Sequence, residues 1–130
     1  LAGVARPCDW TRATAWTFEP LDDDAFPAVR LARLAGGAAG TAPAVYNAAN
    51  EICVDAFCAG RLDFPGILHT IETVLTEHLS DAPATAADQP ESRHVDDAAL
   101  SVEAVLGADA WARRRAAELT APDPADTDPR

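Results

Sequence analysis

The chain has 130 residues, a formal net charge of −11 and only ten basic residues. Nucleic-acid binding needs clustered Lys and Arg, and a membrane span needs roughly 20 consecutive apolar residues, so neither function is expected here. Apolar residues make up 48% of the chain and aromatic residues only 6%. Such a chain is long enough for one core, and its small side chains let helices approach closely. The composition therefore favours an all-α fold.

Residues 1–22 are predicted to form an extended linker. Aromatic, β-branched and Pro residues are mixed there without a helical period. Exposed in water, Trp10, Trp16 and Phe18 would present a large apolar surface. We therefore expect them to be covered by the bundle that follows or by a domain upstream. A chain that begins at Leu1 and contains no Met is itself expected to be a piece of a longer protein.

The first helix is expected to open at the acidic run 22–24, with Asp24 as its N-cap and Pro27 in its first turn. A double glycine, Gly36 and Gly37, is expected to end it. Its predicted buried stripe consists of Phe26, Val29, Ala32 and Ala35.

A second helix is predicted to start at Thr41 and Pro43 and to end at Gly60, because no Gly or Pro lies between Ala44 and Ala59. Apolar residues recur there every three to four positions, which predicts two opposite faces. The apolar face consists of Val45, Ala49, Ile52, Cys53 and Ala56, and the opposite face of Asn47, Glu51, Asp55 and Cys58.

Three polar residues of this helix, Asn47, Asn50 and Glu51, are the candidate site. Asn is a poor helix former, so we expect the two amides to bond backbone outside the helix. Glu51 follows Asn47 by four positions, so the two side chains are neighbours and could brace a loop or linker together. Structural bracing is favoured over a role for Glu51 as a general base.

The third helix is predicted to begin at an Asp63 cap, with Pro65 in its first turn. The connection to the second helix is short, so the two helices should be antiparallel neighbours. His69 and His78 are spaced poorly for metal ligands and are expected to be solvated beside carboxylates. The predicted buried stripe consists of Phe64, Ile67, Leu68, Ile71, Val74, Leu75 and Leu79.

Residues 80–100 are predicted to be an acidic loop with a possible helical turn at 95–100, because no period is sustained there. Ser101 should cap the last helix, and Trp111 should lie at the edge of its apolar stripe. The three arginines 113–115 spread around about 200° of a helix, which favours a solvated face over a partner contact. The side chains expected to face inward are Val102, Val105, Leu106, Ala112, Ala116 and Leu119.

These elements predict a small four-helix bundle at 23–120 between the linker, 1–22, and a disordered tail, 121–130. Cys8, Cys53 and Cys58 follow no disulfide or metal spacing, which indicates reduced, buried thiols in a cytoplasmic protein. No Gly-rich nucleotide loop, no paired metal carboxylates and no nucleophile with a credible base can be found. We therefore predict no catalytic, cofactor-binding or metal-binding residue in this chain.

The run Asn47-Ala48-Ala49-Asn50-Glu51, followed by Ala56-Phe57, Gly60-Arg61 and Phe64, resembles the C-terminal region of the 1-deoxy-D-xylulose 5-phosphate reductoisomerase family. Residues 1–4 resemble the end of that family's catalytic region and 14–22 its linker. Residues 26–32 and 102–117 are similar to its first and last bundle helices. The chain differs from the family at Asp55, Cys58 and the 80–100 loop.

The resemblance implies an NADPH-dependent parent enzyme that uses Mg or Mn to make 2-C-methyl-D-erythritol 4-phosphate for isoprenoid biosynthesis by the methylerythritol phosphate pathway. The family's nucleotide motif and metal carboxylates would lie upstream of Leu1. This piece alone would then be inactive and bind neither cofactor. It would buttress the catalytic domain of a parent that is typically a homodimer. The alternative is a stand-alone acidic helical module that holds a protein partner through Asn47, Glu51 and the arginines 113–115.

Overall fold

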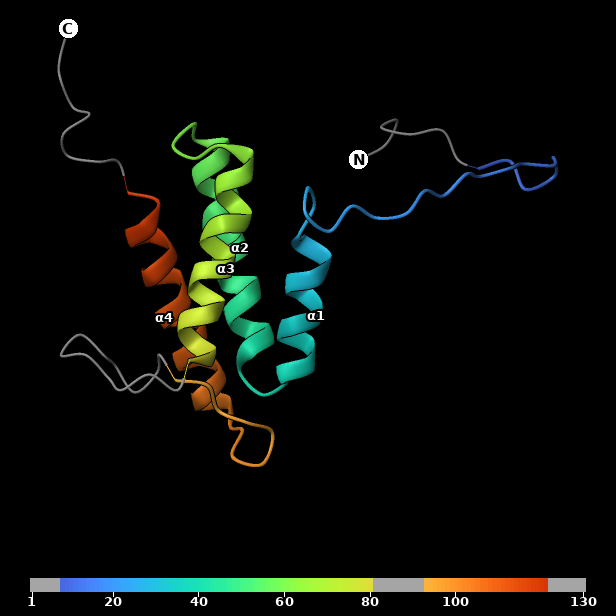
Figure 1. Cartoon of the computed structure of the whole chain (residues 1–130). Coiled ribbons are helices and arrows are strands. Elements are labelled where there is room, and N and C mark those ends of the chain that lie inside the picture. The colour runs from blue at the N-terminus through green and yellow to red at the C-terminus, as the bar shows by residue number, and fades with distance from the viewer. Residues whose placement is uncertain (1–7, 81–92, 122–130) are drawn as a thin grey trace, which may run out of the picture.

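The computed structural model describes residues 8–80 and 93–121. These residues form four helices and no strand: α1 (Ala28–Ala38), α2 (Ala42–Cys58), α3 (Phe64–Leu79) and α4 (Val102–Leu119). Figure 1 shows them side by side as a small bundle with α1 at one edge. The predicted all-α four-helix fold is confirmed. The division into linker, bundle and tail stays a prediction, since 1–7, 81–92 and 122–130 lie outside the described residues.

Helix α2 is the centre of the bundle because α1, α3 and α4 all pack against it. Its predicted apolar face is confirmed, with Ile52 half-buried and the others fully buried. The opposite face is exposed, as expected. Three buried alanines of α4, Ala108, Ala112 and Ala116, join Ala48 and Ala49 of α2 in the main core. Side chains this small let the two helix backbones approach closely.

Helix α3 begins as its sequence predicts. The Asp63 carboxylate accepts a hydrogen bond from the Gly66 amide at 2.8 Å, and Pro65 lies in the first turn. Figure 1 shows α3 running back along α2, so the predicted antiparallel pair is confirmed. The expectation for Phe64 was wrong, because its side chain is exposed at the turn between the two helices. The core-facing residues of α3 include Ile67, Ile71, Val74 and Leu75.

Several expectations for α1 were wrong. Pro27 precedes the helix as its N-cap residue and offers no side-chain cap, while Asp22, rather than Asp24, accepts bonds from the amides of the preceding turn. The helix continues through Gly36 and Gly37, because packing against α2 and α3 holds it to Ala38. That packing also selects the buried face. The buried residues of α1 are Leu31 and Ala35, and the expected Phe26, Val29 and Ala32 are exposed.

In α4 the Ser101 cap is confirmed, since its hydroxyl accepts from the Ala104 amide at 3.1 Å. The inward face is only partly as expected. The alanines turn toward α2, so the larger Val102, Leu106 and Leu119 stay exposed, while Val105 is half-buried. Hydrophobicity alone predicts that the larger apolar side chains of α4 are buried. Because α4 packs closely against α2, its smallest side chains are buried instead.

A buried polar cluster fastens the segment that precedes α4 to the bundle. The Thr41 hydroxyl, at the start of α2, lies 2.9 Å from Nε2 of His78 and accepts a hydrogen bond from the Val95 amide at 3.0 Å. The Thr41 amide donates to the Val95 carbonyl at 3.0 Å. Gly40 has φ 51°, and a Cβ there would collide with the Val95 carbonyl. A glycine is therefore required where these two segments meet.

The expectation that His78 is solvated was wrong. Its side chain is 1% exposed and stacks on Trp111, with ring centroids 5.5 Å apart. Its backbone carbonyl accepts from the His94 amide at 3.1 Å. The residues that cover His78 lie far along the chain, so its local sequence gives no sign of burial. His69 is exposed, as expected, and Trp111 is half-buried against the core.

The three thiols have different environments. Cys53 is fully buried, and burial raises its pKa, while Cys8 and Cys58 are exposed. The expectation of buried cysteines therefore holds only for Cys53. None of the three forms a disulfide.

The described part of the linker lies away from the bundle (Figure 1). Residues 8–22 are exposed, including Trp10, Trp16 and Phe18. The Trp16 and Phe18 rings contact each other, with centroids 6.4 Å apart. Their cover therefore does not come from this bundle. Across 8–80 and 93–121, no helix is both long and apolar enough to cross a membrane.

We expect Thr41→Val to lower the free energy of unfolding by about 1–3 kcal/mol, because the Val95 amide and His78 lose a partner that the isosteric side chain cannot replace. Thr76→Val, at an exposed position of α3, is the matched control. Thermal and urea melts compare the two, and hydrogen exchange should quicken at the Val95 amide. Equal melts for the two variants would contradict a fastening role for Thr41.

Candidate functional site

The exposed face of α2 carries two of the three candidate residues in direct contact. Asn47 Nδ2 donates a hydrogen bond to Glu51 Oε1 at 2.9 Å. The predicted pairing at this four-residue spacing is thus confirmed. The expectation that the Asn47 amide bonds backbone outside the helix was wrong, because its partner is a side chain of the same helix. At a spacing of four residues on a helix, the Glu51 carboxylate lies within reach of the Asn47 amide and so becomes its partner.

The second oxygen of Glu51 joins α2 to α4. Arg113 Nη2 donates to Glu51 Oε2 at 2.7 Å, and Arg113 Nε donates to Asp109 Oδ2 at 2.8 Å. The hydrogen bond from Arg113, followed by the one from Asn47, lowers the pKa of the Glu51 carboxyl. The hydrogen bonds that Arg113 donates to Asp109 and to Glu51 raise the pKa of Arg113. One arginine therefore holds two carboxylates of neighbouring helices in a single polar cluster.

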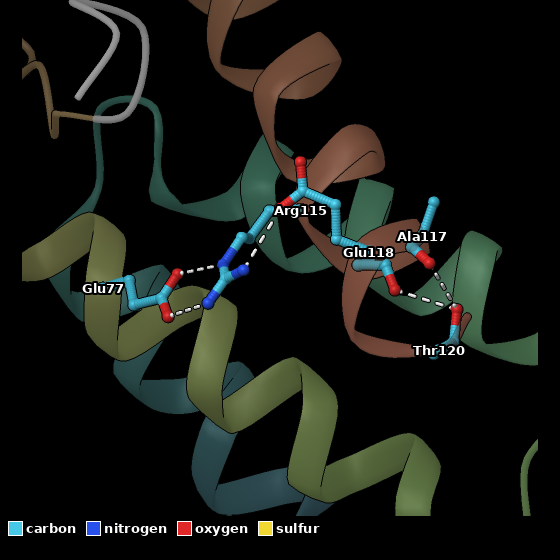
Figure 2. Close-up of polar contacts among 6 residues, drawn as sticks. Glu77, Arg115, Ala117, Glu118 and Thr120 are labelled. Atoms are coloured by element: carbon cyan, nitrogen blue, oxygen red, sulfur yellow. Dashed lines mark hydrogen bonds and ion pairs between the residues drawn. The ribbon is translucent and has the colours of Figure 1, made fainter. Parts of the chain in front are cut away.

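A second arginine joins α4 to α3 on another side of the helix. Arg115 donates through Nε and Nη2 to the two oxygens of Glu77, each at 2.8 Å, and through Nη1 to Glu118 at 3.1 Å. Figure 2 shows the guanidinium facing the Glu77 carboxylate with two parallel contacts. The hydrogen bond that Arg115 donates to Glu77 is the largest cause that raises the pKa of Arg115. Such a bidentate pair fixes orientation as well as distance.

Helix α4 ends shortly after the Arg115–Glu77 pair, and Thr120 follows its last residue. The Thr120 hydroxyl is buried and donates to the Ala116 carbonyl at 2.8 Å. Figure 2 shows the same hydroxyl beside the Ala117 carbonyl, which lies 3.4 Å away. Sequence reasoning anticipated that the arginines 113–115 spread around the helix. It missed that Arg113 and Arg115 each reach a carboxylate on a different helix. The only sign of these ion pairs in the sequence is that α2 and α3 carry more acidic than basic residues. The partners themselves cannot be read from a local pattern, because they lie 62 and 38 positions away along the chain.

Asn50, the third candidate, does not join the cluster of Asn47, Glu51 and Arg113. It is half-buried and lies one turn beyond Tyr46, whose hydroxyl donates to the Ala28 carbonyl at 3.3 Å. Asn50 therefore lies on the side of α2 that carries Tyr46. The structure brings two of the three candidate residues together and separates the third. Their role in bracing the linker stays a prediction.

The chemistry of this surface favours cohesion of the bundle. A general base works best with a pKa near the operating pH, whereas the pKa of Glu51 is shifted away from that range. Within the described ranges, no group of three or more His, Cys, Asp or Glu side chains could hold a metal ion. The polar contacts that are present tie α4 to its two neighbours.

Fold and polar surface together define a small helical domain whose arginines link its helices. The family model described as the DXP reductoisomerase C-terminal domain matches residues 2–115. The chain belongs to this family. The match includes all the described candidate residues and the described part of the linker.

Curated relatives agree with this family. The chain is 62% identical to a 1-deoxy-D-xylulose 5-phosphate reductoisomerase of Cutibacterium acnes, over 93% of this chain and 29% of the relative. It is 52% identical to the reductoisomerase of Kitasatospora griseola and 53% identical to that of an Arthrobacter species, each over 91% of this chain. Those matches cover 27% and 26% of the two relatives. The chain thus spans less than a third of the length of these relatives.

We expect the contribution of Glu51 to stability to depend on pH. Because the folded protein lowers its pKa below the ordinary value of 4.5, the contribution is present above that value and is lost as the pH falls through the folded pKa. Glu51→Gln should therefore melt at a lower temperature than the unmodified chain at neutral pH, and the two should converge in acid.

The control repeats this comparison in an Arg113→Met background. Arg113 supplies the first cause of the shift, so most of the pH-dependent difference should vanish there. A difference of the same size with and without Arg113 would contradict the assigned cause.

Proposed function

We propose that this chain is the C-terminal, non-catalytic bundle of an NADPH-dependent 1-deoxy-D-xylulose 5-phosphate reductoisomerase. The observation that carries the proposal is the family match over residues 2–115, together with 62% identity to a reductoisomerase. The parent enzyme would use Mg²⁺ or Mn²⁺ and NADPH to convert that substrate to 2-C-methyl-D-erythritol 4-phosphate in the cytoplasm. Both cofactors would be held by residues upstream of this chain.

The role proposed for the bundle is that of a buttress for the upstream catalytic and NADPH-binding domains. A domain that supports a neighbouring domain must itself be rigid. The core of α2, α3 and α4 and the ion pairs of Arg113 and Arg115 support such rigidity. The exposed apolar side chains of the linker support a second requirement, which is a partner that covers them. The parent is proposed to be a homodimer through its central domain.

Asn47, Asn50 and Glu51 are proposed to brace the linker when the parent is assembled. Asn50 supports this proposal most directly because it is half-buried one turn from Tyr46, whose hydroxyl bonds the first residue of α1. The stand-alone interaction module is less favoured, since Arg113 and Arg115 already pair with carboxylates of their own bundle. The charges of these two arginines are therefore paired within the domain, which leaves them less suited to bind a protein partner.

Bracing by Asn50 is tested with the variant Asn50→Ala in this chain alone and in a chimera in which this chain replaces the matched part of the Cutibacterium acnes reductoisomerase. If Asn50 holds the linker in the assembled parent, the variant should lower the melting temperature of the chimera more than that of the chain alone. An equal loss in both would assign Asn50 to the stability of the bundle and contradict the bracing role.

The reductoisomerase proposal is tested with a chimera. This chain replaces the matched part of the Cutibacterium acnes reductoisomerase, and turnover is followed as NADPH oxidation with 1-deoxy-D-xylulose 5-phosphate and Mg²⁺ or Mn²⁺. We expect an active chimera, and no turnover by this chain alone. A folded but inactive chimera would contradict the proposed function.

The control is the same relative with its matched part deleted. If the bundle is a buttress that catalysis requires, this shortened enzyme should lose most of its turnover. Activity equal to that of the chimera would show that the upstream domains need no buttress.

A further inference from the structure

Helix α1 packs against only part of the length of α2 and α3. The Tyr46 hydroxyl on α2 bonds the carbonyl of the first α1 residue, and Arg30 of α1 pairs with Glu72 of α3 at 3.0 Å. From Tyr46, α2 continues for twelve residues to Cys58, a rise of about 18 Å. Figure 1 shows α1 beside one part of α2 and α3, with the rest of both helices extending past it.

Beyond the reach of α1, the end of α2 and the start of α3 carry an apolar surface, which we call the aromatic corner: Val54, Phe57 and Phe64. These side chains are 39%, 42% and 60% exposed. Phe57 follows Tyr46 by eleven residues, about three turns, so it lies on the side of α2 that faces α1 lower down. The Phe57 and Phe64 rings meet edge to face, with centroids 6.0 Å apart. The corner is therefore already formed from two helices before any partner binds.

The surroundings of the aromatic corner resemble the anatomy of an interface. Arg61 is exposed in the turn between Phe57 and Phe64 and supplies a polar edge to an apolar centre. Paired, partly exposed aromatic side chains are typical anchors of protein interfaces. If it remained exposed to water, this apolar surface would add nothing to the stability of a small acidic domain.

The choice of occupant follows from the linker, the charge and the length of the relatives. The linker leaves the bundle at the start of α1, the end of α1 that is nearer the aromatic corner (Figure 1). Two copies of a chain with net charge −11 would repel each other, which disfavours self-association. The relatives are more than three times as long as the matched part, so in a protein of that kind a large upstream portion continues from the linker.

We propose that the aromatic corner is the surface on which the upstream, catalytic portion of the same polypeptide docks, through an apolar patch of its own. This inference rests on the proposed function and specifies which face of the bundle makes the buttress contact. Because the linker joins the two portions covalently, a modest apolar contact suffices to hold them together. The exposed pair Val102 and Leu106, near the start of α4 at the other end of the bundle, is assigned no such role.

The test measures the protection of one introduced thiol at each end. Val54→Cys reports on the aromatic corner and Leu106→Cys, at a 63% exposed position of α4, is the control. Each is labelled with iodoacetamide in this chain alone and in the Cutibacterium acnes chimera, and peptide mass spectrometry resolves the sites. Labelling needs an accessible thiolate, so Val54→Cys should slow by at least about tenfold in the chimera and Leu106→Cys by less than about twofold.

Rapid labelling of Val54→Cys in an active chimera would overturn the docking surface and leave the reductoisomerase proposal intact. Conversely, protection at Val54 in a folded but inactive chimera would support the surface and reject the proposed function. Slow labelling in the chain alone would also overturn the assignment, because the occupant would then be the linker or a second copy. Deleting residues 1–22 and diluting the chain distinguish those two occupants.

A second variant tests the contact without an introduced thiol in the corner. Phe57→Ser combined with Phe64→Ser should lower the turnover and the melting temperature of the chimera, while circular dichroism of the isolated chain stays helical. Val102→Ser combined with Leu106→Ser should leave the turnover of the chimera unchanged. If the α4 pair were the sensitive one, docking would have to be assigned to the opposite end of the bundle.

Discussion

The close contact between α2 and α4 is the constraint on which the rest of the bundle depends. Ala48 and Ala49 on one helix and the alanines of the other leave no bulk between the backbones. Packing this close removes water from both helices but offers little apolar area per residue, because an alanine buries only one methyl group. The larger apolar side chains are consequently concentrated on α3, whose Ile71, Val74 and Leu75 complete the core.

The ion pairs of α4 complement a core of small residues. Small side chains interdigitate weakly and allow a helix to slide or rotate, whereas the contacts of Arg113 and Arg115 reach α2 and α3 in two different directions. Each pair is partly exposed and contributes modestly to stability. Together they fix the rotation of α4 about its axis. A domain that serves as a buttress needs that definition of shape more than it needs additional stability.

The two ends of the bundle differ in a way that bears on function. At one end the Thr41 and His78 cluster closes the structure over the segment before α4, and its polar groups are buried and paired. At the other end Phe57 and Phe64 stay exposed to solvent, at the part of α2 and α3 that α1 does not reach. One end is complete within the chain. The other keeps an exposed apolar surface, which the docking contact proposed above would cover.

The sequence by itself determined the number of helices, the caps at Asp63 and Ser101, the apolar face of α2 and the pairing of Asn47 with Glu51, because these depend on neighbours within one or two turns. The tertiary structure alone decided that Gly36 and Gly37 continue a helix, that His78 is buried and that Phe64 is exposed. Each of these depends on residues distant in sequence. Packing against α2 and α3 overrides the helix-ending tendency of glycine, while Trp111 and His94 cover a histidine that no local pattern distinguishes from a solvated one.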